Sequence, residues 1–117
     1  MGDETPLRGM VRQGDLLLVP AETLPEPPLV ERPRRDGRLV LARGEQSGHA
    51  HAVLEPGARL LGSPLDPDGE EPLVLLVEEE PVTLVHEEHA PIRLAPGAYE
   101  VRRQREYSRS GERRAID

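Results

Sequence analysis

The chain has 117 residues with 22 acidic and 15 basic side chains, and its formal net charge is −7 at pH 7. This length predicts one domain with one hydrophobic core. The excess of negative charge argues against nonspecific nucleic-acid binding by the chain as a whole. The absence of cysteine excludes disulfides, thiolate metal sites and a cysteine nucleophile.

The N-terminal stretch lacks the pattern of a secretory signal, and no apolar run is long enough for a membrane-spanning helix. We therefore expect a cytoplasmic protein that does not associate with membranes. Phe and Trp are absent, and Tyr99 and Tyr107 are the only aromatic residues apart from the histidines. The core must consequently be built from Leu, Val and Ala.

Short apolar runs separated by Pro and Gly follow one another along the chain, and none has the spacing of an amphipathic helix. The continuous run at 73–78 indicates a strand that is covered on both faces. We expect an all-β domain over residues 1–107, a small barrel or sandwich of about eight short strands, and an Arg-rich C-terminal tail at 108–117 that contains at most single helical turns. The predicted strands span residues 15–20, 29–31, 38–44, 49–55, 58–62, 73–78, 82–86, 92–95 and 98–107.

The four histidines occur as two pairs, in "GHAHAV" and in "LVHEEHAPI". His49 and His51 share one face of a strand, because side chains alternate along extended backbone. Two imidazoles on one face can bind a divalent transition metal such as Zn, Ni, Fe or Cu, and His86 and His89 could supply further ligands. The two pairs therefore form a candidate metal or polar ligand site.

The same alternation supports a simpler interpretation. Ala50, Ala52 and Leu54 lie on the opposite face, and if that face meets the core, the histidines point to solvent. Structural, hydrogen-bonded histidines are a third alternative. Periodicity alone does not choose among them.

The segment "HEEH" is one residue shorter than the H-E-x-x-H pattern that places two histidines one helical turn apart. We expect a tight connection that carries His86 and His89 and ends before Pro91. Glu87 and Glu88 could act there as a metal ligand or general base, or remain solvated as part of an acidic run.

"HAHAVLEPGARLLG" resembles the first motif of the cupins, through His49, His51, Glu55 and Gly62. The resemblance implies a cupin-like β-barrel in which these two histidines and Glu55 bind a metal. It makes Glu55 the candidate catalytic residue, as a ligand or general base. "APGAY" lacks the histidine of the second cupin motif, so His86 or His89 would have to replace it.

The last predicted strand carries Tyr99, Arg103, Arg105 and Tyr107 on one face by alternation. Arginines flanked by tyrosines could bind an anion or stack on a base. In the favoured alternative, the tyrosines seal the end of the domain and the arginines pair with the acidic flank 66–88, which contains nine acidic residues and no Lys or Arg.

Four blocks of the sequence resemble a family of small bacterial and phage proteins of unknown activity: "RQGDLLLVP", "LARGEQSGHAHAV", "HEEHAPIRLAPGAYEVRRQREYS" and the terminal "AID". This resemblance implies that the histidine segments and the tyrosine-bearing strand belong to one constellation.

Two functions follow from these observations. The first is a small β-barrel that binds a metal or polar ligand through its histidines, with a reaction, if any, that the residues do not define. The second is a noncatalytic module that binds a protein, or less favourably a nucleic acid, through the Arg-rich final strand and tail. Exposed strand edges and complementary charged segments predict a homo-oligomer, most simply a homodimer.

Overall fold

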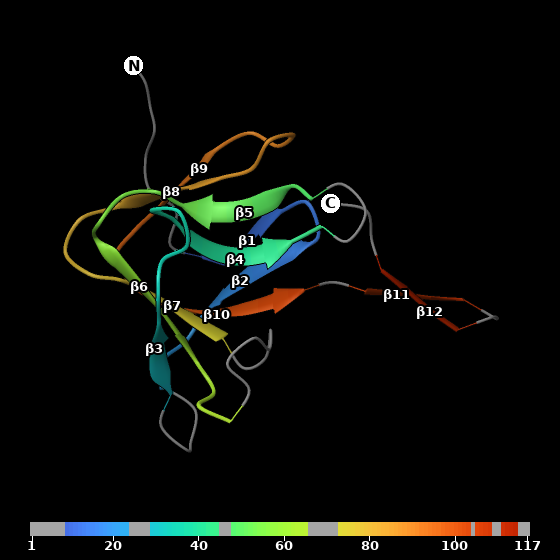
Figure 1. Ribbon diagram of the computed structural model, residues 1–117, viewed down its shortest axis with the longest axis horizontal. Helices are drawn as coiled ribbons and strands as arrows, with labels where there is room; N and C mark the ends of the chain where they lie inside the picture. The colour runs from blue at the N-terminus through green and yellow to red at the C-terminus, as the bar shows by residue number, and fades with distance from the viewer. Residues whose placement is uncertain are drawn as a thin grey trace.

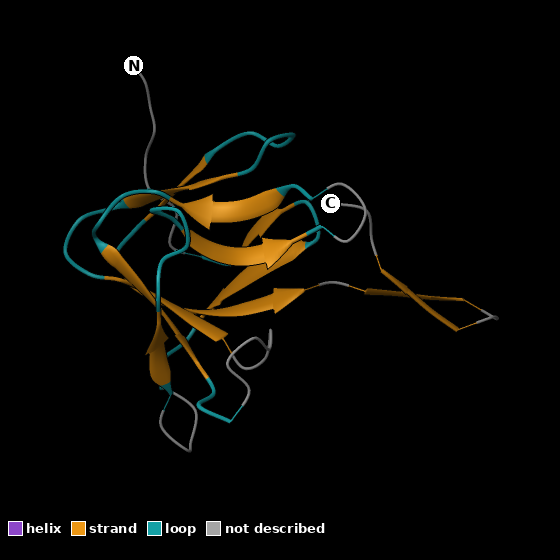
Figure 2. Cartoon of the chain, in the orientation of Figure 1, coloured by secondary structure: helices purple, strands orange, loops and turns teal. Residues whose placement is uncertain are grey.

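The computed structural model describes residues 9–23, 29–44, 48–65 and 73–103, together with the backbone of residues 105–108 and 111–114. Ten strands form two antiparallel sheets that pack face to face as a sandwich (Figure 1). Only strands and loops occur in this part of the chain (Figure 2). Within the same ranges, no helix is long and apolar enough to cross a membrane.

The larger sheet has the strand order β1-β2-β10-β7-β6-β3. A two-residue turn, Gly14 and Asp15, joins β1 to β2. Gly14 has a φ of 61°, as a type II′ hairpin turn requires at its first central position. The strands are β1 (Val11–Gln13), β2 (Leu16–Pro20), β3 (Val30–Arg32), β6 (Ala58–Gly62), β7 (Leu73–Val77) and β10 (Gly97–Arg103).

The smaller sheet has the order β4-β5-β8-β9. Its register pairs Ala52 with Val85 and Val53 with Leu84, which brings the two histidine segments to the same end of the sheet. A separate hairpin follows β10, formed by β11 (Arg105–Ser108) and β12 (Gly111–Arg114). The strands of the smaller sheet are β4 (Leu39–Arg43), β5 (Ala50–Val53), β8 (Val82–Val85) and β9 (Ile92–Leu94).

The core lies between the two sheets and is almost entirely aliphatic. In the larger sheet, Leu75 of β7 pairs with both Leu60 and Tyr99, so these side chains share the inner face. In the smaller sheet, Val53 and Leu84 are cross-strand partners on the inner face. Alternation along each strand therefore delivers one apolar face per sheet to a single core.

The structure confirms the expected all-β domain and shows that it is a sandwich and not a barrel. The sheets do not close into a barrel, because β1 and β3 form the edges of one sheet and β4 and β9 the edges of the other. A cupin-like barrel is therefore wrong. The expected burial of 73–78 on both faces is confirmed for β7, where Val74 and Leu75 are both inaccessible to solvent.

Three local differences from the expected elements have simple causes. The short strand β1 was not expected, because its three residues "VRQ" carry a single apolar side chain. The strand expected at 98–107 is divided into β10 and β11. The tail contains strand β12 rather than a helical turn. The proposed domain boundary after residue 107 stays a prediction.

The first prediction concerns the core. We expect Leu75→Ala to lower the free energy of unfolding by about 2–5 kcal/mol, because a side chain with no solvent exposure leaves a cavity between the sheets. Leu65→Ala is the matched control, since Leu65 is 88% exposed and its truncation should change stability by less than about 0.5 kcal/mol. Urea unfolding of both variants measures the difference, and equal effects would contradict the assigned core.

Candidate functional site

The four histidines lie together at one end of the sandwich. The ring centroids of His51 and His86 are 4.3 Å apart, those of His86 and His89 are 4.6 Å apart, and those of His49 and His86 are 5.6 Å apart. His49 and His51 come from the start of β5, whereas His86 and His89 lie on the tight connection between β8 and β9.

The register of β5 and β8 explains this convergence. Continued past the pair Ala52 and Val85, it places His51 opposite His86 and His49 opposite Glu88. Directly opposed residues on antiparallel strands have side chains in contact range. The connection that carries His86 and His89 is short, as expected, and β9 begins at Ile92, directly after Pro91.

His51 faces the core and not the solvent. The side chain of His51 has 0% exposure, and Val53, on the same face of β5, belongs to the core. Leu54, on the opposite face, is 56% exposed. The interpretation that left the histidines on the wet side of the sheet is therefore wrong for His51. A fully buried imidazole needs polar partners, because burying an unsatisfied polar group costs stability.

Gln13 supplies the first partner of His51. The Oε1 atom of Gln13 lies 2.8 Å from Nδ1 of His51, and its Nε2 donates to the carbonyls of Leu84 and Ala90 at 3.1 and 2.9 Å. Because two carbonyls fix the amide group, the oxygen must face His51, and Nδ1 of His51 therefore carries a proton. Gln13 thus links β1 of the larger sheet to strand β8 of the smaller sheet, through Leu84, and to the end of the β8–β9 connection, through Ala90.

Asp15 lies at the other nitrogen of the His51 ring and connects this end of the site to Arg103. Its Oδ1 lies 3.3 Å from Nε2 of His51, and its Oδ2 accepts a hydrogen bond of 2.8 Å from Nε of Arg103. Arg103 also donates to the carbonyl of Arg43. These contacts join the β1–β2 turn, β5 and β10 in one polar network. The sequence reasoning did not find Gln13 or Asp15, although both flank the turn glycine in "RQGDLLLVP".

Burial is the main influence on the charge of His51. Loss of hydration lowers the pKa of His51 from its usual 6.5 to about 4, with a further contribution from the neighbouring His86, and Asp15 only partly opposes this shift. The ring is therefore neutral in the folded protein at physiological pH, whereas in the unfolded chain it takes up a proton below about pH 6.5.

The second prediction follows from this shift. Between pH 6.5 and 4 the unfolded chain binds more protons at His51 than the folded protein does, so stability must fall as the pH falls through this window. The loss amounts to roughly 3 kcal/mol in full. Urea unfolding in EDTA at several pH values should show a steeper acid loss for wild type than for His51→Gln. Identical slopes would contradict the assignment.

A second group of contacts lies nearer the surface, around Glu87 and Glu88. Oε1 of Glu87 accepts a hydrogen bond of 3.0 Å from the amide of Ala50, and this bond lowers the pKa of the Glu87 carboxyl group. The amide of Glu88 donates to Nδ1 of His86 at 3.0 Å. The carboxylate of Glu88 lies 3.5 Å from Nδ1 of His49.

Three of these side chains could hold a metal ion. One donor atom from each of His49, His86 and Glu87 lies within 4.8 Å of the others. In the described part of the chain, His51 and His89 belong to no such group of three. The two histidine segments are thus brought together, but a compact set of donor atoms includes only one histidine from each.

His89 packs against the β1–β2 turn. A side chain added at Gly14 would place its Cβ 2.6 Å from Nε2 of His89, so only glycine allows the ring to lie there. Nε2 of His89 is buried and has no hydrogen-bond partner among the residues that the structure describes. Gly14 therefore has two roles. It adopts the positive φ that the hairpin turn requires, and its lack of a side chain leaves space for the ring of His89.

The third prediction tests that dual role. Gly14→Ala should cost more than about 1 kcal/mol for a positive φ and, in addition, displace the ring of His89. Gly37→Ala is the matched control, because Gly37 has a φ of 80° and nothing within 4 Å of an added Cβ. Urea unfolding and the ring proton shifts of His89 measure the two effects. Equal destabilisation with unmoved His89 resonances would contradict the close contact.

Glu55 lies apart from the histidines, beyond the far end of β5. Its carboxylate accepts hydrogen bonds from the amide and hydroxyl of Thr83 at 2.8 and 3.0 Å, and lies 3.2 Å from Nη1 of Arg93. Desolvation opposes ionisation, but the bonds from Thr83 and the charge of Arg93 outweigh it and lower the pKa of Glu55. The ligand set of His49, His51 and Glu55 that the cupin resemblance implied is not assembled.

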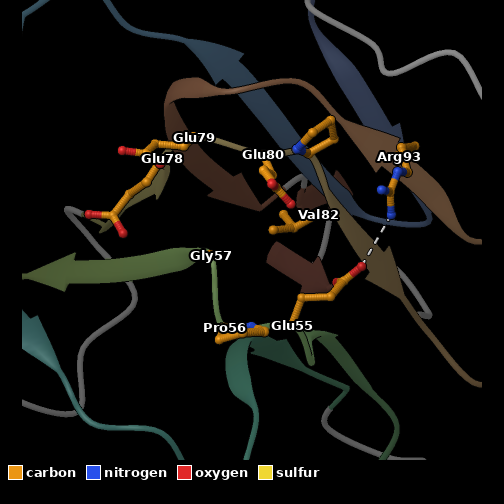
Figure 3. Close-up of a pocket in the computed structure, with 9 residues that line it drawn as sticks. Glu55, Pro56, Gly57, Glu78, Glu79, Glu80, Val82 and Arg93 are labelled. Atoms are coloured by element: carbon orange, nitrogen blue, oxygen red, sulfur yellow. Dashed lines mark hydrogen bonds and ion pairs between the residues drawn. The ribbon is translucent and has the colours of Figure 1, made fainter.

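Glu55 instead lines a surface pocket of about 630 Å³. Figure 3 shows Glu55 and Arg93 in contact on one side of this pocket and three consecutive glutamates, Glu78, Glu79 and Glu80, on another. Of these, Glu78 forms an ion pair of 3.1 Å with Arg59. The pocket is acidic and separate from the histidines.

Of the four tyrosine and arginine residues predicted on one face of the last strand, the structure describes the side chains of Tyr99 and Arg103. Tyr99 is buried and its hydroxyl donates to the carbonyl of Ala95 at 2.6 Å, as expected for a residue that seals the domain. Arg103 forms an ion pair of 2.8 Å with Asp15, which lies outside the acidic flank 66–88. The side chains of Arg105 and Tyr107 lie outside the described residues.

The fold and the site define an all-β sandwich domain with a histidine-rich end. The chain belongs to the family described as "Domain of unknown function (DUF8820)", whose model matches residues 12–104. The match spans the whole buried network from Gln13 to Arg103 and both histidine segments, and it makes no connection with cupins. No curated protein and no solved structure matches the chain.

Proposed function

We propose that this domain binds one divalent transition metal ion through His49, His86 and Glu87. The observation that carries the proposal is the proximity of their donor atoms, all within 4.8 Å of one another. Ligands bound to one ion at about 2.1 Å each are necessarily held at such separations.

The donor set narrows the class of metal. Two imidazole nitrogens and one carboxylate oxygen suit Zn²⁺, Fe²⁺, Ni²⁺ and Cu²⁺ better than the oxygen-seeking Mg²⁺ and Ca²⁺. Three protein ligands leave at least one coordination position for water or another molecule. Because Glu87 is exposed and His49 is only partly buried, that position would lie at the surface.

The contacts of two ligands support this arrangement. Nδ1 of His49 faces the carboxylate of Glu88, the kind of outer contact that orients a ligating histidine for binding through Nε2. Glu87 uses Oε1 to accept the amide of Ala50, and its second oxygen can bind the ion. The Ala50 amide also holds the Glu87 side chain against the start of β5.

The proposal omits two of the four histidines. Nδ1 of His51 contacts Gln13, and its Nε2, 3.3 Å from Oδ1 of Asp15, belongs to no compact group of three donor atoms among the described residues. Nε2 of His89 faces Gly14 at the β1–β2 turn. We assign these two rings to the packing around the site.

The fourth prediction tests the ligand set. Zinc titration of EDTA-treated, dialysed protein by calorimetry should give one ion per chain for wild type and no measurable binding for His49→Ala or His86→Ala. His89→Ala is the matched control and should bind zinc with an affinity within about threefold of wild type. Zinc at one hundred times its Kd should stabilise the fold by about 2.7 kcal/mol.

Two results would overturn the proposal. One is the absence of zinc, nickel, iron and copper binding by well-folded wild-type protein. The other is loss of binding in His89→Ala with full binding in His49→Ala, which would place the ion elsewhere in the histidine cluster.

A further inference from the structure

We propose that Glu88 controls the tautomers of both ligand histidines, so that metal binding releases its amide from His86 while its carboxylate continues to orient His49. The inference rests on the proposed function and adds a positioning residue and a coupled structural change to it. Its basis is the unusual position of Glu88, which contacts one histidine through its backbone and the other through its side chain.

The backbone contact defines the tautomer of His86. Nδ1 accepts the hydrogen bond from the amide of Glu88 at 3.0 Å, so this nitrogen presents a lone pair and carries no proton. A neutral imidazole has one N–H group, which must then be on Nε2. The hydrogen bond also fixes the ring orientation, because a flipped ring would present a carbon atom to the amide.

The hydrogen bond from the Glu88 amide is incompatible with a metal ion at either nitrogen of His86. If the ion binds Nδ1, it takes the lone pair that the Glu88 amide now uses. If the ion binds Nε2, the proton of that nitrogen must leave, and a neutral ring then carries its proton on Nδ1, facing the amide N–H. The contact between the Glu88 amide and His86 must therefore end in both cases, with no net change in the number of protons on the ring.

The contact between the Glu88 side chain and His49 is, in contrast, compatible with metal binding. Nδ1 of His49 lies 3.5 Å from a carboxylate oxygen of Glu88, an ion-pair contact in which the ionised carboxylate offers no proton. This contact favours a proton on Nδ1 and so directs Nε2 of His49 to the metal. Glu88 thus makes one histidine contact that metal binding preserves, with His49, and one that metal binding breaks, with His86.

The release of the amide has a structural consequence. Glu88 lies between His86 and His89 on the connection that β8 and β9 share, and the carbonyl of Ala90 at its far end is held by Gln13. Movement of the Glu88 amide must therefore be absorbed within the few residues of the turn. Metal binding would reshape the turn and leave the buried network in place.

The fifth prediction tests the side-chain contact. Glu88→Gln should weaken zinc binding by about tenfold or more in calorimetry, a typical effect for the loss of a residue that orients a metal ligand. Glu88 is 58% exposed on its side chain, so the variant should fold normally. Glu80→Gln is the matched control, since it removes the same charge at the separate acidic pocket, and its zinc affinity should stay within about twofold of wild type.

Ring ¹⁵N NMR and amide hydrogen exchange test the coupled change in the same samples. Without metal, His86 should show the Nε2–H tautomer and the Glu88 amide should be protected from exchange. With one equivalent of zinc, the Nδ1 resonance of His86 should shift, because this nitrogen becomes either metal-bound or protonated, and the protection of the Glu88 amide should be lost, while His49 keeps its Nδ1–H signature. A role of Glu88 in stability alone would not change these ring signals.

The outcomes separate this inference from the proposed function. Zinc bound through His86, as shown by its loss in His86→Ala, together with an unchanged Glu88 amide and His86 tautomer, would overturn the inference and leave the metal site standing. A Glu88→Gln variant with wild-type zinc affinity and an unaltered His49 tautomer would overturn the orienting role. Failure of the wild type to bind any of the tested metals would overturn both proposals.

Discussion

The contact between the imidazole of His51 and the side chains of Gln13 and Asp15 is the constraint on which this end of the molecule depends. It is made where the larger and smaller sheets meet, and all three residues are buried. Polar groups buried this deeply rigidify a structure only when all of them are satisfied. Here the amide group of Gln13 donates to two carbonyls and accepts from Nδ1 of His51, and the carboxylate of Asp15 accepts from an arginine.

This constraint explains why the histidines have different roles although they occur as similar pairs. The sandwich core is aliphatic at its centre and becomes polar at one end, where His51 replaces what would otherwise be an inward apolar residue of β5. His86 packs on that ring and is in turn the boundary between the buried network and the surface. The candidate metal ligands therefore rest on a rigid base, an arrangement that favours a defined ligand geometry.

Much of the fold could be derived from the alternation of apolar residues, because each strand has one face on a single core. The run at β7 was recognisable as doubly covered, and the parity of "HAHAV" limited His51 to one of two faces. The choice between a barrel and a sandwich could not be made, because it depends on which strands remain edges, and edges are defined by partners far apart in sequence.

The candidate site, like the fold, could be predicted from the sequence only in part. The two histidine segments could be recognised, but the register of β5 against β8 that joins them depends on pairing between strands that are not adjacent in the sequence. Gln13 and Asp15 could not be found, because they reach His51 across 38 and 36 residues of sequence and no local pattern marks them. The pairing of Arg103 with Asp15, across 88 residues, was not expected for the same reason. Glu55 was included on spacing alone, but its strand ends before it and Thr83 and Arg93 hold it elsewhere.

The origin of the three candidate ligands has a mechanical consequence. All of them belong to the end of the β5–β8 ladder within the smaller sheet, whereas the network of His51 bridges both sheets. Ladder ends open at a lower free energy than the global fold, so the candidate ligands can separate transiently while the sandwich stays closed. Loading and loss of an ion would then follow the fraying of a few backbone hydrogen bonds and would not require the two sheets to part.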